Sequence, residues 1–210
     1  ILFENTRKLN IDEVRQSISE FQRAPTFNPN YGFTDNGVWL YANFSNVTDT
    51  KDWVIDLGFT QLDRVDFYLY SEGTLIAQSS QGKLGTQQSY RFPTLEAELP
   101  FAMSLELFVR VESAATSIIA PIDILSKQKH TRKVFYDNTV WGFFYGSLIV
   151  LALYGLVQYP ANREKSLLVY ALFNLTVIVW QLGWGGHAQM LLPTTINHWL
   201  SKNVSLLFIF

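Results

Sequence analysis

Cysteine is absent from the 210-residue sequence, which excludes disulfide crosslinks, thiolate metal sites and cysteine nucleophiles. Histidine is scarce as well, and His130 is the only histidine before residue 140. No Ser/His/Asp arrangement, histidine cluster or phosphate-binding glycine loop can therefore be assembled from the first two thirds of the chain. We expect no catalytic residues, no metal site and no cofactor, and hence no enzyme activity in this chain.

An excess of basic charge is also missing. The chain has 16 Lys+Arg against 18 Asp+Glu, a formal net charge of −2. Nucleic-acid binding calls for a basic patch or stripe, so nucleic acid is not an expected partner.

Charged residues of either sign nearly disappear after Thr139. Residues 140–210 contain four of them, namely Arg163, Glu164, Lys165 and Lys202. The remaining 13 basic and 17 acidic residues all lie in residues 1–139. We therefore expect two regions, a water-soluble domain over residues 1–130 and the start of a membrane helical bundle over residues 131–210.

The apolar third predicts three membrane-spanning helices, at about 140–159, 166–186 and 199–210, the last of them truncated. A lipid bilayer is thus the first expected partner. The alternative for each span is a buried core helix of a soluble protein. Gly142 and Gly146 match the small-x-x-x-small pattern of packed membrane helices. We expect them to pack within the molecule, with a homodimer as the alternative.

Both ends of the chain indicate a fragment. The sequence starts without Met, and it stops inside the apolar run 204–210. We expect it to be part of a longer protein from which any signal peptide has been removed.

The first two thirds predict a β-sandwich. Asn10 followed by Glu13 resembles a capping box, which predicts a helix from there to about Phe21. Alternation of apolar and polar residues then predicts strands at 38–46, 53–57, 63–70, 74–78, 105–112 and 118–125. Many short strands without intervening helices are typical of a jelly-roll sandwich. Glu96 and Glu98 are interpreted as a solvated strand face.

Three of these strands share an unusual pattern, with aliphatic residues on one face and mixed aromatic and charged residues on the other. The second face carries Trp39, Tyr41, Asn43, Arg64, Asp66, Tyr68, Tyr70, Glu106, Phe108, Arg110 and Glu112. Aromatic rings stack on sugars, and Arg with acids can hydrogen-bond hydroxyls or carboxylates, so such a face could bind a small polar ligand. The alternative is that these aromatics fill a second core or pack under loops.

Several motifs in order resemble one family, the bacterial seven-transmembrane receptors with diverse intracellular signalling modules (7TMR-DISM). They are Tyr31-Gly-Phe-Thr-Asp-Asn-Gly-Val-Trp-Leu-Tyr-Ala-Asn-Phe-Ser-Asn46, Trp53-Val-Ile-Asp-Leu57, Leu62-Asp-Arg-Val-Asp-Phe-Tyr-Leu-Tyr70, Leu107-Phe-Val-Arg-Val-Glu-Ser113 and Trp141-Gly-Phe-Phe-Tyr-Gly-Ser147. The resemblance covers the chain from about Asn10 to Phe210.

The resemblance implies a periplasmic jelly roll similar to carbohydrate-binding modules, seven helices in the inner membrane, and a cytoplasmic output module. That module is commonly a diguanylate cyclase or a histidine kinase, and it lies outside this chain. The family's ligand face, carried over by position, corresponds to Trp39, Tyr41, Tyr68 and Arg110. The implied ligand is a small polar, carbohydrate-like molecule.

One feature opposes this topology. Lys127, Lys129, Arg132 and Lys133 precede the first span, and a count of positive charges would place the soluble domain in the cytoplasm. Large domains delivered by a leader escape that count, so we expect the periplasmic side. The segment 127–133 also joins the last strand to the first helix, and we expect it to couple the two regions.

A ligand-sensing receptor is the function that the sequence favours. Arg110→Ala is then expected to weaken the ligand response without unfolding the domain. One alternative is a membrane-anchored carbohydrate-active enzyme, which would need a carboxylate pair across a cleft, with Asp66 and Glu112 as the candidates. Another is an adaptor with a flat apolar outer face.

Overall fold

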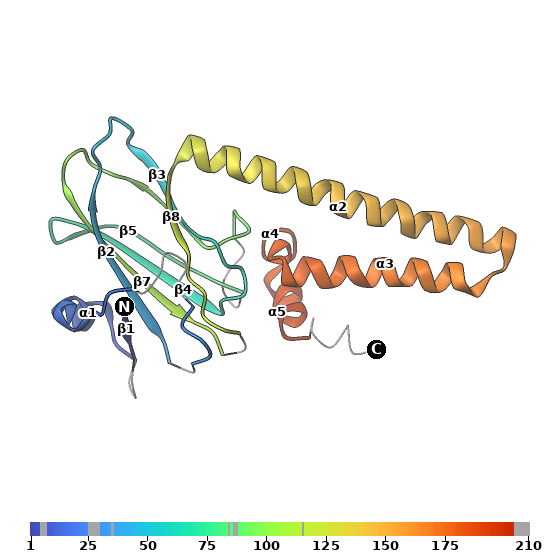
Figure 1. Cartoon of the computed structure of the whole chain (residues 1–210), viewed down its shortest axis with the longest axis horizontal. Coiled ribbons are helices and arrows are strands. Elements are labelled where there is room, and N and C mark those ends of the chain that lie inside the picture. The colour runs from blue at the N-terminus through green and yellow to red at the C-terminus, as the bar shows by residue number, and fades with distance from the viewer. Residues whose placement is uncertain are drawn as a thin grey trace.

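A computed structural model of the chain shows a β-rich domain from which a long helical hairpin projects (Figure 1). The structure describes residues 1–4, 8–24, 30–34, 36–83, 85, 88–114 and 116–203, without the side chain of Lys202. The end of the third expected span, residues 204–210, lies outside the described residues.

The β-rich domain consists of two antiparallel sheets. The larger has the strand order β1-β2-β7-β4-β5, and the smaller has the order β6-β3-β8. The strands of the larger sheet are β1 Leu2–Phe3, β2 Val38–Ser45, β7 Ser104–Glu112, β4 Arg64–Ser71 and β5 Thr74–Gln81. Those of the smaller sheet are β6 Thr94–Glu98, β3 Asp52–Leu57 and β8 Ile122–Ser126. This arrangement confirms the predicted β-sandwich followed by helices.

The main core lies between the two sheets. Aliphatic side chains from alternate positions of β2, β4 and β7 meet Ile55 and Leu57 of β3 and Leu95 of β6, and all of them are buried. The alternation read from the sequence therefore identified the inward face of each of these strands.

All six predicted strands occur, with shifted ends. The largest shift is in β8, which begins at Ile122 and not at residue 118. Strands β1 and β6 were not among the predicted set, although Glu96 and Glu98 do lie exposed on β6.

The predicted N-terminal helix forms as α1, Ile11–Gln16, and Ile18–Glu20 continues as a 3₁₀ turn. Its capping box is present: the Asn10 side chain accepts from the Glu13 amide, and the Glu13 carboxylate accepts from the Asn10 amide, both at 2.9 Å. The α-helix ends earlier than the expected Phe21.

Helix α2, Lys127–Asn162, follows β8 without a break and is 36 residues long. At 1.5 Å per residue it extends roughly 54 Å, well beyond the hydrocarbon thickness of a bilayer. The expected span 140–159 is therefore only the distal part of this helix. The expected domain boundary at 130/131 falls inside α2, because the basic segment 127–133 is helical.

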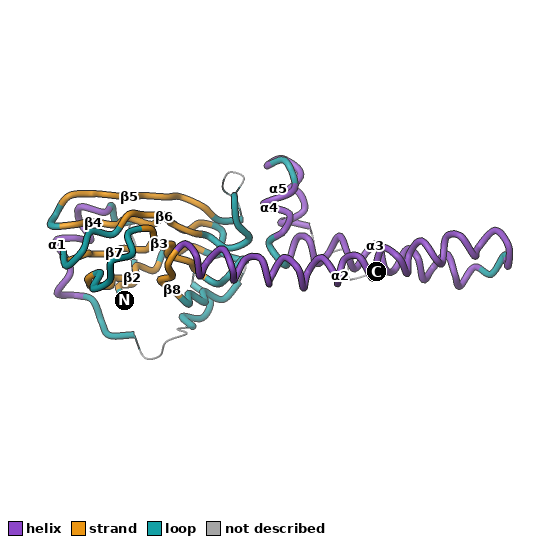
Figure 2. Tube along the Cα trace, turned by 90° about the horizontal axis from the view of Figure 1, so that it is seen from above, coloured by secondary structure: helices purple, strands orange, loops and turns teal. Residues whose placement is uncertain are grey.

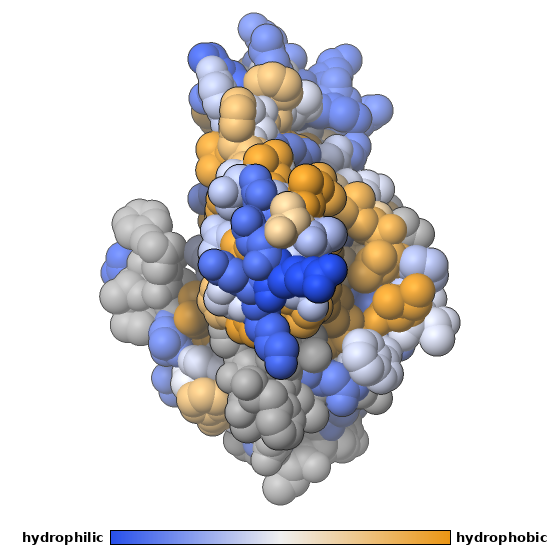
Figure 3. All heavy atoms as spheres, turned by 90° about the vertical axis from the view of Figure 1, so that its right-hand side faces the viewer, coloured by the Kyte–Doolittle hydropathy of each residue, from blue (hydrophilic) through white to orange (hydrophobic). Residues whose placement is uncertain are grey.

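Helix α3, Lys165–Trp184, returns beside α2, as two perpendicular views show (Figures 1 and 2). Both helices are long and apolar enough to cross a membrane. In the most apolar 18-residue stretch of each helix, only 11% (α2) and 17% (α3) of the residues are buried. A soluble core helix would be mostly buried, so that alternative is disfavoured. Figure 3 shows hydrophobic residues surrounding a hydrophilic patch at the tip of this hairpin.

The third expected span, from Trp199, differs from the structure. The short helix α4, His187–Leu191, is followed by α5, Thr194–Asn203, which begins five residues earlier than predicted. Leu200 of α5 and Ala188 of α4 are buried against each other, with Trp180 of α3 beside them.

Close packing of α2 on α3 involves small residues, but not the ones predicted. A Cβ added at Gly155 would come within 2.8 Å of the Leu167 carbonyl oxygen and 3.2 Å of the Ala171 Cβ. At Gly142 and Gly146 an added Cβ would meet no described atom within 4 Å. The prediction that these two glycines pack within the molecule is thus wrong for the part that the structure describes.

Candidate functional site

The predicted ligand residues lie together on the outer face of the five-stranded sheet. The strand register places Trp39 of β2 and Asp66 of β4 on either side of Arg110 of β7. The next row along the same face aligns Tyr41 and Tyr68 with Phe108. The sequence therefore identified correctly which side chains share this face.

This face is not open to solvent. The N-terminal segment, residues 1–4 and 8–21, covers it: β1 forms the edge of the sheet beside β2, and the residues around α1 pack on the face (Figure 1). Trp39 is 1% exposed and Arg110 2%, while Tyr41 and Tyr68 are partly buried. The covering residues are Leu2, Leu9, Ile11, Val14, Ile18 and Phe21.

The aromatic residues of the face and the covering residues form a second hydrophobic core, in which the rings contact one another. Trp39 stacks on Tyr68 with centroids 6.0 Å apart, and Tyr41 lies 4.9 Å from Phe108. From α1, the Arg15 guanidinium sits 4.0 Å from the centroid of the Tyr70 ring. The aromatic residues of the face thus pack under the N-terminal segment. This agrees with the alternative interpretation of the sequence, in which they fill a second core.

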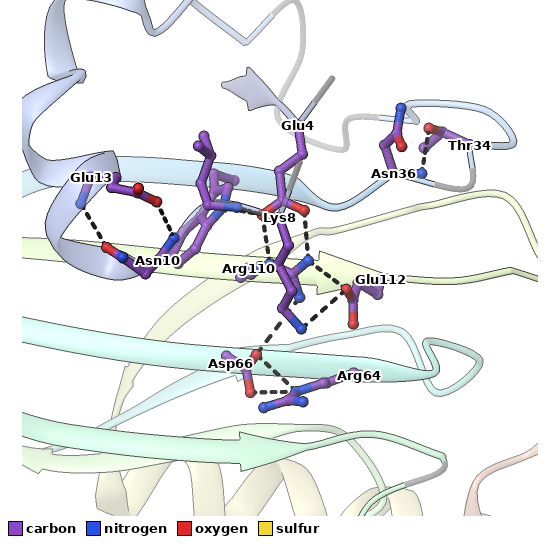
Figure 4. Close-up of polar contacts among 12 residues, drawn as sticks. Glu4, Lys8, Asn10, Glu13, Thr34, Asn36, Arg64, Asp66, Arg110 and Glu112 are labelled. Atoms are coloured by element: carbon purple, nitrogen blue, oxygen red, sulfur yellow. Dashed lines mark hydrogen bonds and ion pairs between the residues drawn. The ribbon is translucent and has the colours of Figure 1, made fainter. Parts of the chain in front are cut away.

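Arg110 is the centre of a buried polar network (Figure 4). Its Nε donates to Glu4 Oε1 at 2.8 Å, and its Nη2 donates to Glu4 Oε2 at 2.6 Å. The Trp39 indole N–H donates to the same Glu4 oxygen at 2.8 Å. Arg110 also pairs with Glu112 and lies 4.0 Å from Asp66. Bidentate pairing of this kind is strong and directional.

The network shifts the pKa of its members. Burial alone would raise the pKa of Glu4, but hydrogen bonds from Arg110 and Trp39 outweigh it and leave that pKa below its usual value. The pKa of Glu112 is lowered in the same way, since Arg110 outweighs the effect of burial. Burial opposes the charge of Arg110, yet its pKa is raised because two carboxylates bind it.

The enzyme alternative required Asp66 and Glu112 to flank a cleft. Asp66 is buried, and its Oδ1 accepts from Arg64 Nε at 2.9 Å and from the Ser80 hydroxyl at 2.5 Å. Glu112 is bound to Arg110 and lies 3.6 Å from Lys8. Asp66 therefore binds partners on the sheet itself, and Glu112 links Arg110 of the sheet to Lys8 of the N-terminal segment.

A second polar region connects the sandwich to α2. The first turns of α2 cross the outer face of the small sheet, where Lys133 Nζ contacts Asp56 at 2.7 Å and Asp123 at 3.0 Å. Lys127 Nζ contacts Glu96 at 2.9 Å. We call this contact between residues 127–137 and the small sheet the joint. Asp56 is 1% exposed, so Lys133 neutralises a buried carboxylate.

The far end of α3 also contacts the sandwich. The Thr60 hydroxyl donates to the Trp184 carbonyl at 3.1 Å, and the Gln61 amide donates to the same carbonyl. In return, Gln189 of α4 donates to the Thr60 carbonyl at 3.3 Å. Gly186, with φ of +81°, lets this turn approach Thr60 closely.

Arg91 ties these two contacts together. Its Nη2 donates to Asp137 of α2 at 2.8 Å, and its Nη1 donates to the Gly185 carbonyl at 3.3 Å. The guanidinium also lies 4.3 Å from the Phe92 ring centroid and 5.5 Å from that of Trp141. Burial lowers the pKa of Arg91 in spite of the neighbouring Asp137 carboxylate.

Comparison with known families agrees with this two-part structure. The 7TMR-DISM extracellular 2 family matches residues 1–126, and the 7TM diverse intracellular signalling family matches residues 137–210. The chain belongs to the 7TMR-DISM family. It is a membrane protein with an extracellular domain and a transmembrane signalling region of such receptors. No match was found among curated proteins.

Several residues of these two regions were not identified from the sequence. Glu4 stands in a short N-terminal stretch without a clear pattern, and Asp56 lies within the apolar strand β3. An Asp within an apolar strand is expected to be buried and to need a basic partner, so the sequence could have indicated a partner such as Lys133. Contacts of Thr60, Gln61 and Arg91 join segments about 90 to 130 residues apart, and no local pattern reports them.

Proposed function

We propose that this chain is the sensory and first membrane part of a receptor that transmits ligand binding in the β-sandwich to its helical bundle. The receptor lies in the bacterial inner membrane with the sandwich in the periplasm. A cytoplasmic output module, a diguanylate cyclase or a histidine kinase by family resemblance, completes it. The family matches support the receptor class.

The observation that carries this function is the continuity of α2. The helix begins at Lys127, directly after β8, and stays helical through the joint into the apolar span. A continuous helix is stiff, so a change in how the sandwich holds residues 127–137 moves the whole of α2. A flexible linker at this point would absorb such a change.

The joint also supports a periplasmic sandwich. Lys127 and Lys133, half of the basic residues that precede the span, are paired with carboxylates of the small sheet. Because these two charges are paired within the domain, they are weaker evidence for a cytoplasmic sandwich when the positive charges beside the membrane are counted.

We place the polar, carbohydrate-like ligand on the face that contains Trp39, Tyr41, Tyr68 and Arg110. The Glu4 carboxylate accepts two hydrogen bonds from the Arg110 guanidinium in this structure. A ligand hydroxyl or carboxylate therefore has to displace Glu4 in order to bind Arg110. Binding there would release part of the N-terminal segment. This coupling gives the ligand a differential affinity for two states, which a sensor requires.

The test compares Lys133→Ala with Lys129→Ala in the intact receptor. Lys133→Ala leaves the buried Asp56 carboxylate without its nearest cation and loosens the joint, whereas Lys129 is exposed. We expect Lys133→Ala to change the basal output, measured as cyclic dinucleotide synthesis or autophosphorylation, at least fivefold. Lys129→Ala should stay within twofold of the unmodified receptor. Equal output from both variants, with the sandwich folded, would show that the joint does not transmit the signal.

A further inference from the structure

A small cavity lies inside the joint, between the small sheet and the first turns of α2. Its walls include Asp56 and Arg91 from the sandwich side and His130, Lys133 and Asp137 from α2, with Tyr90 beside them. Its volume is about 50 Å³. A water needs about 10–15 Å³ of such space, so the cavity has room for roughly four waters or one molecule of similar size.

Three polar atoms of the residues that line this cavity have no hydrogen-bond partner within the described part of the chain. They are Asp56 Oδ1, Arg91 Nε and His130 Nδ1. Asp56 is 1% exposed and His130 is 2% exposed. Buried polar atoms of this kind are normally satisfied, and leaving them unsatisfied is costly. The cavity is therefore built to hold a polar occupant.

The unsatisfied atoms specify the chemistry of that occupant. Asp56 Oδ1 belongs to a carboxylate and needs a donor, and Arg91 Nε belongs to a guanidinium and needs an acceptor. Lys133 and Asp137 already pair with Asp56 and Arg91, so the walls are balanced in charge. A molecule with both a cationic donor and an anionic acceptor would form charge-assisted hydrogen bonds at both ends. Water and uncharged hydroxyls form weaker ones.

Other ligand classes fit less well. A sugar ring is too large for about 50 Å³. Among the described residues, no group of three or more His, Asp or Glu side chains is placed to hold a metal ion. A simple anion would leave Asp56 unsatisfied, and a simple cation would leave Arg91 unsatisfied.

We propose that this cavity binds a small zwitterion of the size of glycine, with its ammonium group on Asp56 and its carboxylate on Arg91. His130 Nδ1 provides a third contact. Because the ligand touches the sandwich and α2 together, its binding stabilises the closed joint. This second site goes beyond the proposed function, which places a carbohydrate-like ligand on the opposite sheet of the sandwich.

The test is titration calorimetry of the whole chain in lipid nanodiscs with glycine, acetate and methylammonium as probes. We expect saturable binding of glycine, at least tenfold tighter than either singly charged probe. Val134 also lines the cavity, so Val134→Phe should fill it and abolish binding. Val140→Phe, at a position of the same helix that is 67% exposed, is the matched control and should bind as the unmodified chain does.

A second variant covers the case in which Val134→Phe displaces α2. The His130 ring meets Tyr90 edge-on with centroids 4.7 Å apart, and His130→Phe preserves that contact while removing Nδ1. We expect it to weaken glycine binding at least threefold with little change in melting temperature. Equal affinities for glycine and acetate, unchanged binding in His130→Phe, or a crystal soaked in glycine that holds only water in the cavity would overturn the proposal. None of these outcomes bears on Lys133→Ala, whose test involves no glycine.

Discussion

At the residue scale, Arg110 shows how burial changes the role of a side chain. Its position on a face rich in aromatic and charged residues predicts a ligand contact, because a solvated guanidinium can bind hydroxyls and carboxylates. In the folded chain Glu4 and Glu112 already bind it, and its side chain is 3% exposed. Arg110 thus holds the N-terminal segment on the sheet, a role that its own strand does not reveal.

Arg110→Ala should therefore destabilise the sandwich, in contrast to the expectation from the sequence. Removing one partner of a buried ion pair costs about 3–5 kcal/mol, because Glu4 is left buried without the Arg110 cation that pairs with it. Lys8→Ala is the matched control, since it removes an exposed pair to Glu112 at 3.6 Å and should cost under about 1 kcal/mol. Urea unfolding followed by near-UV circular dichroism measures both. Similar midpoints for the two variants would contradict this structural role.

The same network predicts a dependence of stability on pH. The folded-state pKa of Glu4 lies below the ordinary value of 4.5, so the ion pair stabilises the folded state fully above that value. The stabilisation is lost as the pH falls through the folded-state pKa, when Glu4 becomes protonated.

We expect the melting temperature of the unmodified chain to fall as the pH drops below about 4.5, and to fall less steeply in Glu4→Gln. Gln keeps the shape of the side chain but does not titrate. Melting curves recorded at intervals between pH 6 and pH 3 give the two slopes. Parallel slopes would mean that Glu4 does not contribute to the acid sensitivity.

At the element scale, the hairpin of α2 and α3 contacts the sandwich at both of its open ends. Helix α2 is bound along its first turns by Lys127, Lys133 and Asp137, and the end of α3 is bound through Trp184, Gly185 and Gly186. Both contacts include buried or half-buried polar groups, so separating them breaks specific hydrogen bonds and ion pairs. The hairpin is therefore held to the sandwich at two points that differ in chemistry.

Gly186→Ala should weaken the second contact. An added Cβ would come within 2.7 Å of Thr60 Cγ2, and the residue has a φ of +81° that side chains other than glycine adopt at a cost of about 1 kcal/mol. We expect faster hydrogen exchange of the amides in residues 58–63, measured by mass spectrometry. Gly142→Ala is the control, because its added Cβ meets no described atom within 4 Å. Equal exchange in the two variants would show that this turn does not hold the loop.

The elements themselves were largely predictable, for reasons that differ between them. Aliphatic residues alternate strictly along strands β2, β4 and β7 because one face of each strand is buried in the main core. This alternation does not depend on how the individual side chains pack. Helix α2 was only partly predicted. Its first turns are rich in charged residues, so they give no apolar signal, and they are helical because the small sheet supports them.

At the scale of the whole molecule, the sandwich lies at one end of the α2–α3 hairpin and the turn between the two helices lies at the other (Figure 1). The sandwich and the turn between α2 and α3 are separated by the length of the apolar part of both helices (Figure 2). A receptor that senses outside and signals inside requires these two parts on opposite sides. The absence of cysteine provides a clean background for testing this.

Single cysteines at Val47 and Asn162 should give opposite labelling. Val47 is 77% exposed on the sandwich, and Asn162 is exposed at the end of α2. In spheroplasts, a membrane-impermeant maleimide should label Val47→Cys and leave Asn162→Cys unlabelled until the membrane is lysed. The reverse pattern would place the sandwich in the cytoplasm and remove the proposed topology.

The amino-acid sequence alone predicts a water-soluble region and a membrane region, the β-sandwich, and which residues share each sheet face. These properties depend on composition and on short-range periodicity, which the chain carries at every position. Three features emerge in the folded chain alone: the N-terminal segment covers Trp39 and Arg110, α2 extends through the joint, and Asp56, Arg91 and His130 line a cavity. These features arise from contacts between residues far apart in the chain. Burial at these contacts forces charged side chains to pair with one another instead of with water, as Arg110 and Glu4 do.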